Sequence, residues 1–199
     1  TEEKNKALQT AANDLCERQE EILAANVLDL ENGKNNGMNP GLLDRLKLTG
    51  ERIAQIAEGL RQIAALPDCI GETIEHFERP NGLKIDKVRV PLGVIGIIYE
   101  ARPNVTADAF GLCFKTGNAV ILKGGSDAIH SNIAIVKVLQ DALEACSMPR
   151  TAVQLIEDTD RAVTAQFMKM KEYVDVLIPR GGAGLILSLI HISEPTRLG

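Results

Sequence analysis

Three polar turns carry the side chains best suited to chemistry, and each follows a short apolar segment. Asn104 follows the apolar run 93–99 and an Arg-Pro pair, Lys123 ends the next apolar run, and Gly181 and Gly182 follow a third. If the apolar segments are parallel strands, these turns lie where open α/β sheets bind ligands, at the carboxyl ends of the strands. The turns therefore predict a ligand crevice.

Asn104 precedes a β-branched pair that opens a predicted helix. A side-chain amide in that place can donate a hydrogen bond to a developing oxyanion, which makes Asn104 a candidate catalytic residue. Asparagine is also among the best N-cap residues, so a capping role explains the same placement. Arg102 is a weaker candidate, for a contact with an anionic substrate, and a structural salt bridge explains it equally well.

Lys123 precedes a Gly-Gly-Ser126 turn, so its ammonium would lie beside flexible backbone at a helix N-terminus. That setting suits ribose hydroxyls or a phosphate, because helix N-termini favour anions. A solvated lysine at a strand end is an equally good interpretation. The turn at Gly181 and Gly182 also leads from a strand toward a helix, but the chain lacks GxGxxG, so a turn without a ligand explains it equally well.

The composition excludes several classes of function. A net charge of -5 provides no basic field for nucleic acid or an anionic membrane surface. No apolar run approaches the roughly 20 residues that span a bilayer, and the N-terminus lacks a signal-peptide profile, so we expect a cytoplasmic protein. The four cysteines form no CxxC pair and the three histidines lack metal-ligand spacing, so we expect neither disulfides nor a metal site.

The first ninety residues predict helices followed by a ribbon. Amphipathic helical spacing covers residues 4–30, and Asn39 before Pro40 reads as an N-cap with proline at the first helical position, beginning one or two further helices. Residues 72–90 then flank an Arg-Pro-Asn-Gly turn, which predicts a two-stranded antiparallel ribbon. The apolar alternation slips by one place between Ile85 and Val88, which allows a β-bulge.

Beyond residue 91 the pattern alternates between strand and helix. We predict strands at 93–99, 118–122, 152–156 and 174–178, and helices at 105–116, 127–146 and 160–170. Alternation of this kind favours the α/β class, with a parallel sheet covered by helices on both faces.

Several long phrases closely resemble the gamma-glutamyl phosphate reductase family, a divergent branch of the aldehyde dehydrogenase superfamily. They are Leu43-Asp-Arg-Leu46, Ile98-Tyr-Glu-Ala-Arg-Pro-Asn-Val-Thr106, Lys115-Thr-Gly-Asn-Ala-Val-Ile-Leu-Lys-Gly-Gly125 and Leu177-Ile-Pro-Arg-Gly-Gly-Ala-Gly-Leu185. The resemblance implies an aldehyde dehydrogenase-like fold, in which N-terminal helices (1–70) and an oligomerisation ribbon (72–90) accompany a Rossmann-like nucleotide-binding sheet (91–186).

The resemblance also implies an activity, the NADPH-dependent reduction of L-glutamate 5-phosphate to glutamate 5-semialdehyde in proline biosynthesis, through a cysteine thioester. Asn104 would then be the oxyanion donor and Lys123 the contact to the adenosine ribose. Ser126 stands where many NAD-using relatives carry a glutamate, and the loss of that carboxylate is consistent with NADPH. Gly181 and Gly182 resemble the loop near the cofactor phosphates. Glutamate 5-kinase and further copies of the chain are the implied partners.

The chain departs from the family at its end. The family's nucleophilic cysteine follows the Arg-Gly-Gly-Ala-Gly-Leu phrase by several tens of residues, so we expect this chain to be a partial NADP-binding domain without it. Cys113 is no substitute, because no base or cation is arranged to lower its pKa. Residues 187–199 resemble nothing in the family, and we expect a non-native tail there.

Two other functions are compatible with the sequence. A different aldehyde dehydrogenase would act on an ordinary aldehyde, but it would carry Pro-Trp-Asn where this chain has Arg102-Pro103-Asn104, and the chain contains no tryptophan. A non-catalytic nucleotide-binding or interaction module is the second alternative.

Overall fold

A parallel four-stranded sheet lies at the centre of the structure, a computed structural model that describes residues 1–100 and 102–181. Its strand order is β5-β4-β3-β6, and the strands are β3 (Val94–Tyr99), β4 (Ala119–Lys123), β5 (Val153–Leu155) and β6 (Val176–Arg180). The predicted α/β class and all four predicted strands are confirmed, with boundaries displaced by at most two residues.

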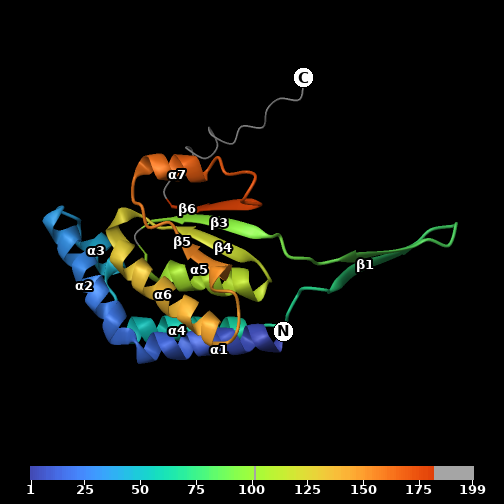
Figure 1. Ribbon diagram of the computed structural model, residues 1–199, viewed down its shortest axis with the longest axis horizontal. Helices are drawn as coiled ribbons and strands as arrows, with labels where there is room; N and C mark the ends of the chain where they lie inside the picture. The colour runs from blue at the N-terminus through green and yellow to red at the C-terminus, as the bar shows by residue number, and fades with distance from the viewer. Residues whose placement is uncertain (101, 182–199) are drawn as a thin grey trace, which may run out of the picture.

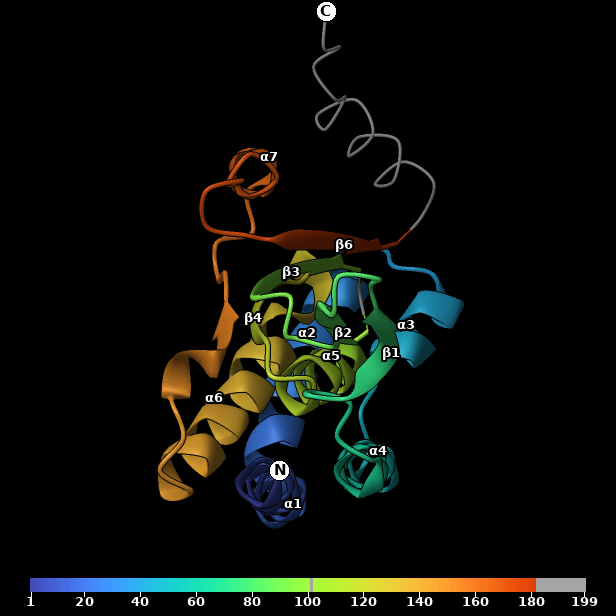
Figure 2. The same ribbon diagram turned by 90° about the vertical axis from the view of Figure 1, so that its right-hand side faces the viewer.

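Two layers of helices cover one face of this sheet (Figures 1 and 2). The inner layer holds α5 (Asn104–Lys115) and α6 (Ile129–Ala145), and the outer layer holds α1 (Glu2–Glu17) and α4 (Gly50–Ala65). Side chains from all four helices and from the sheet form one apolar core. Burial of this continuous surface is the main force that holds the N-terminal helices against the sheet.

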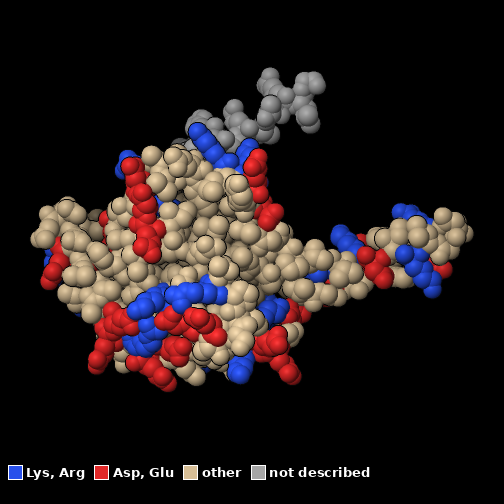
Figure 3. Space-filling model, viewed as in Figure 1, with Lys and Arg blue, Asp and Glu red and all other residues tan. Residues whose placement is uncertain are grey.

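The helical pattern over residues 4–30 forms two helices rather than one. The chain turns at Arg18, between α1 and α2 (Gln19–Asn35), so that α1 packs against both α4 and α6 while α2 packs against α6. The Arg18 guanidinium holds this corner through ion pairs of 2.9 Å to Glu21 and to Asp141 of α6. Figure 3 shows acidic and basic side chains mixed along the lower edge of the molecule, over α1 and α6.

Two short-range caps start the next helices. Asn39 Oδ1 accepts a hydrogen bond of 2.9 Å from Leu42 N at the start of α3 (Pro40–Leu46), which confirms the predicted cap and the proline at the first helical position. Thr49 Oγ1 accepts one of 3.2 Å from Arg52 N at the start of α4.

The opposite face of the sheet is covered by α7 (Arg161–Phe167). Ile98 packs there with Phe167 and Met168 in a small second apolar cluster. Gly96 permits this approach, because a Cβ there would lie 2.8 Å from the Phe167 ring. The prediction of a sheet covered on both faces is therefore confirmed. Two short 3-10 turns, Ser126–Ala128 and Arg150–Ala152, precede α6 and β5 respectively.

A two-stranded antiparallel ribbon projects from the body, as predicted (Figure 1). It consists of β1 (Thr73–Glu78) and β2 (Lys84–Val88), and every residue in both strands is exposed. The pairing register shifts between Thr73 and Glu75 of β1, which lie opposite Val88 and Lys87 of β2. A bulge therefore occurs near the place where the apolar alternation of β2 slips, but its extra residue lies on β1. Within the described ranges, no helix is long and apolar enough to cross a membrane.

Candidate functional site

The carboxyl ends of the parallel strands bring the predicted turns to one edge of the sheet. Ile98 of β3 pairs in register with Lys123 of β4 on one side and with Pro179 of β6 on the other, and Tyr99 pairs with Arg180. Asn104 begins the helix that follows β3. The side chains singled out on three separate turns therefore emerge from the same edge.

The amide of Asn104 does not cap its helix. Pro103 is the N-cap of α5, and no side-chain capping bond is found there among the described residues. Asn104 Nδ2 instead donates a hydrogen bond of 3.3 Å to Asp108 Oδ2, one turn later. The capping interpretation is wrong for this residue, because the helix begins with Asn104 already inside its first turn.

Asp108 holds an unusual position for a carboxylate. Its side chain is half-buried, and this burial raises its pKa, while the hydrogen bond from Asn104 and the positive charge of Arg180 oppose that rise. Arg180 therefore acts electrostatically on the residue that orients Asn104, although it lies at the end of a different strand.

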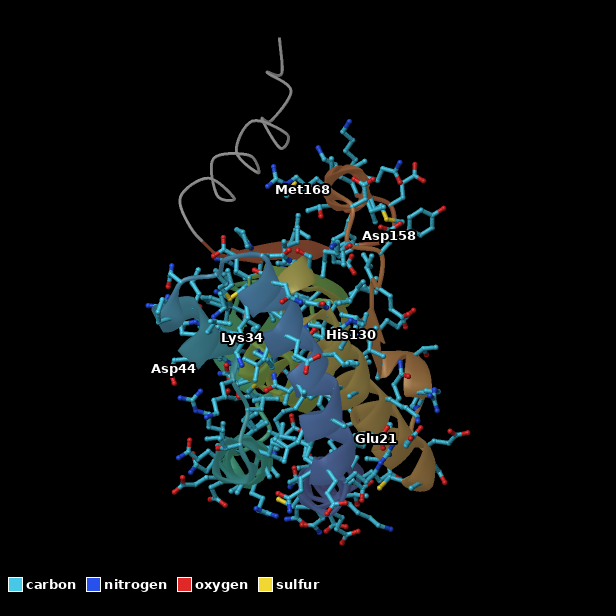
Figure 4. The ribbon with its side chains drawn as sticks, turned by 90° about the vertical axis from the view of Figure 1, so that its left-hand side faces the viewer. Glu21, Lys34, Asp44, His130, Asp158 and Met168 are labelled. Atoms are coloured by element: carbon cyan, nitrogen blue, oxygen red, sulfur yellow. The ribbon has the colours of Figure 1, made fainter. Side chains whose placement is uncertain are left out.

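Two adjoining cavities open beside Asn104. The larger, about 480 Å³, is lined by Asn104 and Asp108 together with basic side chains of the α3–α4 region, and the smaller, about 280 Å³, lies at the ends of β3 and β6. Arg45 and Arg102 line both. The N-terminal helices thus supply part of the wall around the strand ends. In Figure 4, Asp44 of α3 lies on one side of α2 and His130 of α6 lies on the other. Asp44 is one of the residues that line the larger cavity.

Lys123 is buried rather than solvated, with 3% of its surface exposed, so the interpretation as a solvated strand-end lysine is wrong. Its Nζ donates a hydrogen bond of 3.2 Å to the carbonyl oxygen of Gly124. Burial lowers the pKa of Lys123, and the negative charge of Asp158 opposes that shift. Lys123 lines neither cavity, so the structure separates it from Asn104 within the same sheet edge.

The start of α6 is already occupied by a side chain. Asp29, a buried residue of α2, accepts hydrogen bonds from His130 N at 3.1 Å, Ser131 N at 2.8 Å and Ser131 Oγ at 2.6 Å. This carboxylate takes the place that an anionic ligand would fill at a helix N-terminus. The backbone donors of His130 and Ser131 are therefore already used within the protein.

A buried polar chain lies behind the Lys123 turn. Tyr99 OH and Thr106 Oγ1 are 2.8 Å apart, and Thr106 Oγ1 donates to Asn132 Oδ1 at 2.8 Å. Asn132 is fully buried, and its Nδ2 has no hydrogen-bond partner in the described part of the chain. A Cβ on Gly124 would lie 2.4 Å from that nitrogen, so the turn requires glycine at this position.

The remaining predicted residues are more peripheral. Ser126 is exposed at the first position of the 3-10 turn before α6. Gly181 lines the smaller cavity, and Gly182 lies outside the described residues, as do the residues 187–199 predicted as a non-native tail. Arg102 is exposed and lines both cavities, and the salt bridge that would explain it structurally is not found within the described ranges.

Sequence reasoning missed Arg45, Asp108, Arg180 and Asn132. Arg45 and Arg180 lie inside phrases that carry the family resemblance, and this was the one signal that could have drawn attention to them. Nothing local to the sequence marks Asp108 or Asn132, because their importance depends on contacts between different elements.

The cysteines of the described region are free, and Cys113 is buried inside α5. Burial raises the pKa of Cys113 to about 11, so this thiol is protonated at neutral pH and is a poor nucleophile. No group of histidine, cysteine or carboxylate side chains within residues 1–100 and 102–181 is arranged to hold a metal ion.

The parallel sheet, the projecting ribbon and the polar strand ends define an aldehyde dehydrogenase scaffold. The model of the aldehyde dehydrogenase family matches residues 1–182, and the chain belongs to that family. Within it, the chain is similar to gamma-glutamyl phosphate reductases. It is 58% identical over 191 residues to the reductase of Anoxybacillus flavithermus, and the match covers 96% of this chain and 46% of the relative. It is 60% identical over 187 residues to the reductase of Heliobacterium modesticaldum, and the match covers 94% of this chain and 45% of the relative.

Solved structures give the same result. The crystal structure of gamma-glutamyl phosphate reductase from Thermotoga maritima superposes with a TM-score of 0.94 at 43% identity, covering 97% of this chain and 47% of that one. The enzyme from Saccharomyces cerevisiae gives 0.88 at 29% identity, covering 97% and 49%. The aldehyde dehydrogenase-like fold implied by the sequence is confirmed. The chain spans about half the length of the curated relatives that it matches.

Proposed function

We propose that this chain forms the cofactor-binding part of an enzyme that reduces L-glutamate 5-phosphate to glutamate 5-semialdehyde and phosphate with NADPH. The observation that carries the proposal is the position of Asn104. Its amide is not used as a cap, and it lines a cavity beside Arg102 at the carboxyl end of β3. An amide donor beside a guanidinium suits an acyl phosphate, whose reaction builds up charge on the acyl oxygen.

The proposed chemistry begins with attack of a thiolate on the acyl carbon of the substrate. A C–S bond forms, the C–O bond to phosphate breaks, and the electron pair leaves with the phosphate. Asn104 Nδ2 donates to the acyl oxygen while that oxygen carries negative charge. We propose that the thiol comes from the part of the relatives' length that this chain does not span, because burial keeps Cys113 protonated.

The residues of the second turn fit a nicotinamide cofactor, which when bound would supply the hydride that reduces the thioester to the aldehyde. Lys123 Nζ has three protons and donates to the carbonyl oxygen of Gly124, so it has donors left for ribose hydroxyls. Ser126 adds an exposed hydroxyl without a negative charge, which supports NADPH over NADH. Gly181 and Gly182 are proposed to lie near the cofactor phosphates.

The first test measures NADPH binding to the purified chain by nucleotide fluorescence. Saturable binding that is tighter for NADPH than for NADH, and weakened about tenfold or more by Lys123→Ala, is expected. Lys137→Ala is the matched control, because Lys137 is an exposed lysine of α6 paired with Glu21. A chain that circular dichroism shows to be folded, but that binds neither nucleotide, would remove Lys123 and Ser126 from the cofactor site.

The second test asks whether the chain supports turnover. Residues 1–182 replace the matching segment of the Anoxybacillus flavithermus gamma-glutamyl phosphate reductase, and the exchange protein is assayed in reverse, as phosphate-dependent reduction of NADP⁺ by glutamate 5-semialdehyde. Activity that falls at least about a hundredfold in Asn104→Ala is expected for an oxyanion donor. Turnover of ordinary aldehydes without phosphate would favour a different aldehyde dehydrogenase activity.

We also propose that the ribbon joins copies of the chain and that the enzyme is cytoplasmic. Ile74, Phe77, Ile85 and Val88 are all more than a third exposed on β1 and β2, and an isolated two-stranded ribbon is marginally stable in water. Glutamate 5-kinase is the proposed source of the acyl phosphate. Analytical ultracentrifugation of the chain and of a Phe77→Lys variant tests the oligomer, which the variant should weaken.

A further inference from the structure

We propose that Arg45, Arg102 and Arg180 together bind the phosphoryl group of the substrate. The identity of that substrate rests on the function proposed above. The binding of a doubly charged oxyanion at this place rests on the cavity itself.

The three guanidinium groups come from distant parts of the sequence and line one cavity. Arg45 belongs to α3, Arg102 to the turn after β3, and Arg180 to the last position of β6. The cavity that they line measures about 280 Å³, close to the lower end of the range for small-molecule sites. Its other lining residues are Tyr99, Glu100, Val105 and Gly181.

The charge of this cavity is unbalanced. Three arginines and one acidic residue, Glu100, are among its lining residues. Within residues 1–100 and 102–181, none of the three arginines makes an ion pair, whereas Arg18, Arg52, Arg61, Arg89 and Arg150 all do. Guanidinium groups that share a cavity repel one another, and a ligand of negative charge removes that repulsion.

The chemistry of the three groups selects an oxyanion. A guanidinium presents its N–H groups in a planar fork that matches two oxygens of a phosphate or a carboxylate. Three such forks provide more donors than the two oxygens of a carboxylate can accept. A terminal phosphoryl group has three oxygens and can accept from all three guanidinium groups. The lining therefore suits a phosphoryl group better than a carboxylate.

The position of the cavity points to the same end of the substrate. Arg45 and Arg102 also line the larger cavity, which contains Asn104. In an acyl phosphate the phosphoryl oxygen is bonded to the same carbon as the acyl oxygen, so a phosphoryl group must lie next to whatever group binds that oxygen. The α-carboxylate lies at the other end of the molecule. With Asn104 at the acyl oxygen, the adjoining arginines meet the phosphoryl group.

These arginines also have a role while the phosphate leaves. Breaking the C–O bond transfers an electron pair to the phosphate oxygen and increases its negative charge. Fixed positive groups stabilise this charge more than that of the bound substrate, and this difference accelerates the step.

The direct test uses inorganic phosphate and the chain labelled with ¹⁵N-arginine, followed by NMR at the guanidinium resonances. Saturable shifts of the resonances of Arg45, Arg102 and Arg180 are expected, and each Arg→Met substitution should weaken phosphate binding about tenfold or more. Arg161→Met is the matched control, because Arg161 is exposed on α7, on the other face of the sheet. Shifts without saturation, or equal effects of all four substitutions, would overturn the proposal.

The segment-exchange enzyme distinguishes the phosphoryl group from the α-carboxylate. In the reverse reaction, Arg45→Met and Arg180→Met should raise KM for phosphate about tenfold or more and leave KM for glutamate 5-semialdehyde within about twofold. The opposite pattern would assign the pocket to the carboxylate and overturn the proposal. If the exchange enzyme is inactive before any substitution, the proposed function fails, while phosphate binding by the chain still decides whether the arginines form an oxyanion site.

Discussion

The helices α5 and α6 both start at the carboxyl edge of the sheet, yet their first turns are built in opposite ways. At α6 a buried carboxylate, Asp29, satisfies the backbone of His130 and Ser131. At α5 the N-cap is Pro103, and Asn104 turns its amide toward Asp108 and a cavity. One helix start is closed by the protein itself, and the other is left available to a ligand.

This difference separates a structural role from a functional one within two similar strand-turn-helix units. Buried donors that lack partners are costly, so the closed start contributes to stability. Polar side chains that line a solvent-filled cavity cost little, so the open start should contribute little to stability and, as proposed above, keep its donors for a substrate. The two units can therefore be tested against each other by substitution.

The largest effect is expected at the closed start. Asp29→Ala removes the acceptor of three hydrogen bonds and leaves buried donors without partners, which should lower the free energy of unfolding by about 3 kcal/mol. Asn104→Ala, the matched change at the open start, should cost about 1 kcal/mol or less. Urea denaturation of both variants provides the measurement. Equal losses would show that the two helix starts do not differ in the way described.

A smaller loss is expected from crowding the turn that leads into α6. A Cβ in Gly124→Ala would lie 2.4 Å from Asn132 Nδ2, so the variant should be destabilised by about 2 kcal/mol. Gly59→Ala is the control, because its Cβ would lie 3.8 Å from Asp108 Oδ1, and alanine in a helix should stabilise by about 0.5–1 kcal/mol. Thermal unfolding that ranks these two variants in the reverse order would contradict the tight turn.

Cys113 gives a pH-dependent contrast between the interior of α5 and its open start. Its pKa in the folded chain, about 11, is raised above the ordinary value of 9.0 by burial. The neutral thiol contributes its full stabilisation at pH values below the pKa of Cys113 in the unfolded chain. This stabilisation is lost as the pH rises toward the higher pKa of Cys113 in the folded chain. The loss should reach about 1 kcal/mol near pH ~10. Cys113→Ala should reduce this decline in pH-dependent urea titrations and leave the part due to Tyr99, whose pKa burial also raises. Cys146→Ala should retain the whole decline, and a decline unchanged in Cys113→Ala would assign it to other groups.

The smallest effect is electrostatic and belongs to the open start alone. The positive charge of Arg180 lowers the pKa of Asp108, against the effect of burial. Arg180→Gln should therefore raise the pKa of Asp108 further, measured by NMR titration of its carboxyl carbon. Arg161→Gln, a substitution on α7, should leave that pKa unchanged. A pKa that falls in Arg180→Gln would contradict the placement of this arginine beside the Asn104 and Asp108 pair.

The local rules of the sequence predicted most of the fold but only part of the site. Asn39 before Pro40 predicted a helix start because both signals act within one turn, and it is confirmed. The corner at Arg18 was missed because neither Arg18 nor Gln19 is a proline, a glycine or a capping residue that would mark a helix end. Asp29 and Ser131 are 102 positions apart, so no local pattern could reveal that one residue caps the helix of the other.

Arg45 and Arg180 show the same limit at the site. Arg45 lies outside the turns that follow a strand, and Arg180 was passed over beside the glycines of its turn. Each becomes informative only when the fold brings it to the cavity that Arg102 also lines. Asn104 and Lys123 were singled out because α/β sheets bind ligands at their strand ends whatever the chemistry, and their binding roles stay predictions.

The contact between Asp29 and Ser131 also affects how the chain is made. At a synthesis rate of about 5–20 residues per second, roughly 5–20 s separate the emergence of these two residues from the ribosome. Until α6 has been synthesised, the apolar faces of α1 and α2 that pack against it, which include Leu8 and Ile22 of the core, lack that partner. Incompletely covered apolar surface of this kind is what chaperones bind during synthesis.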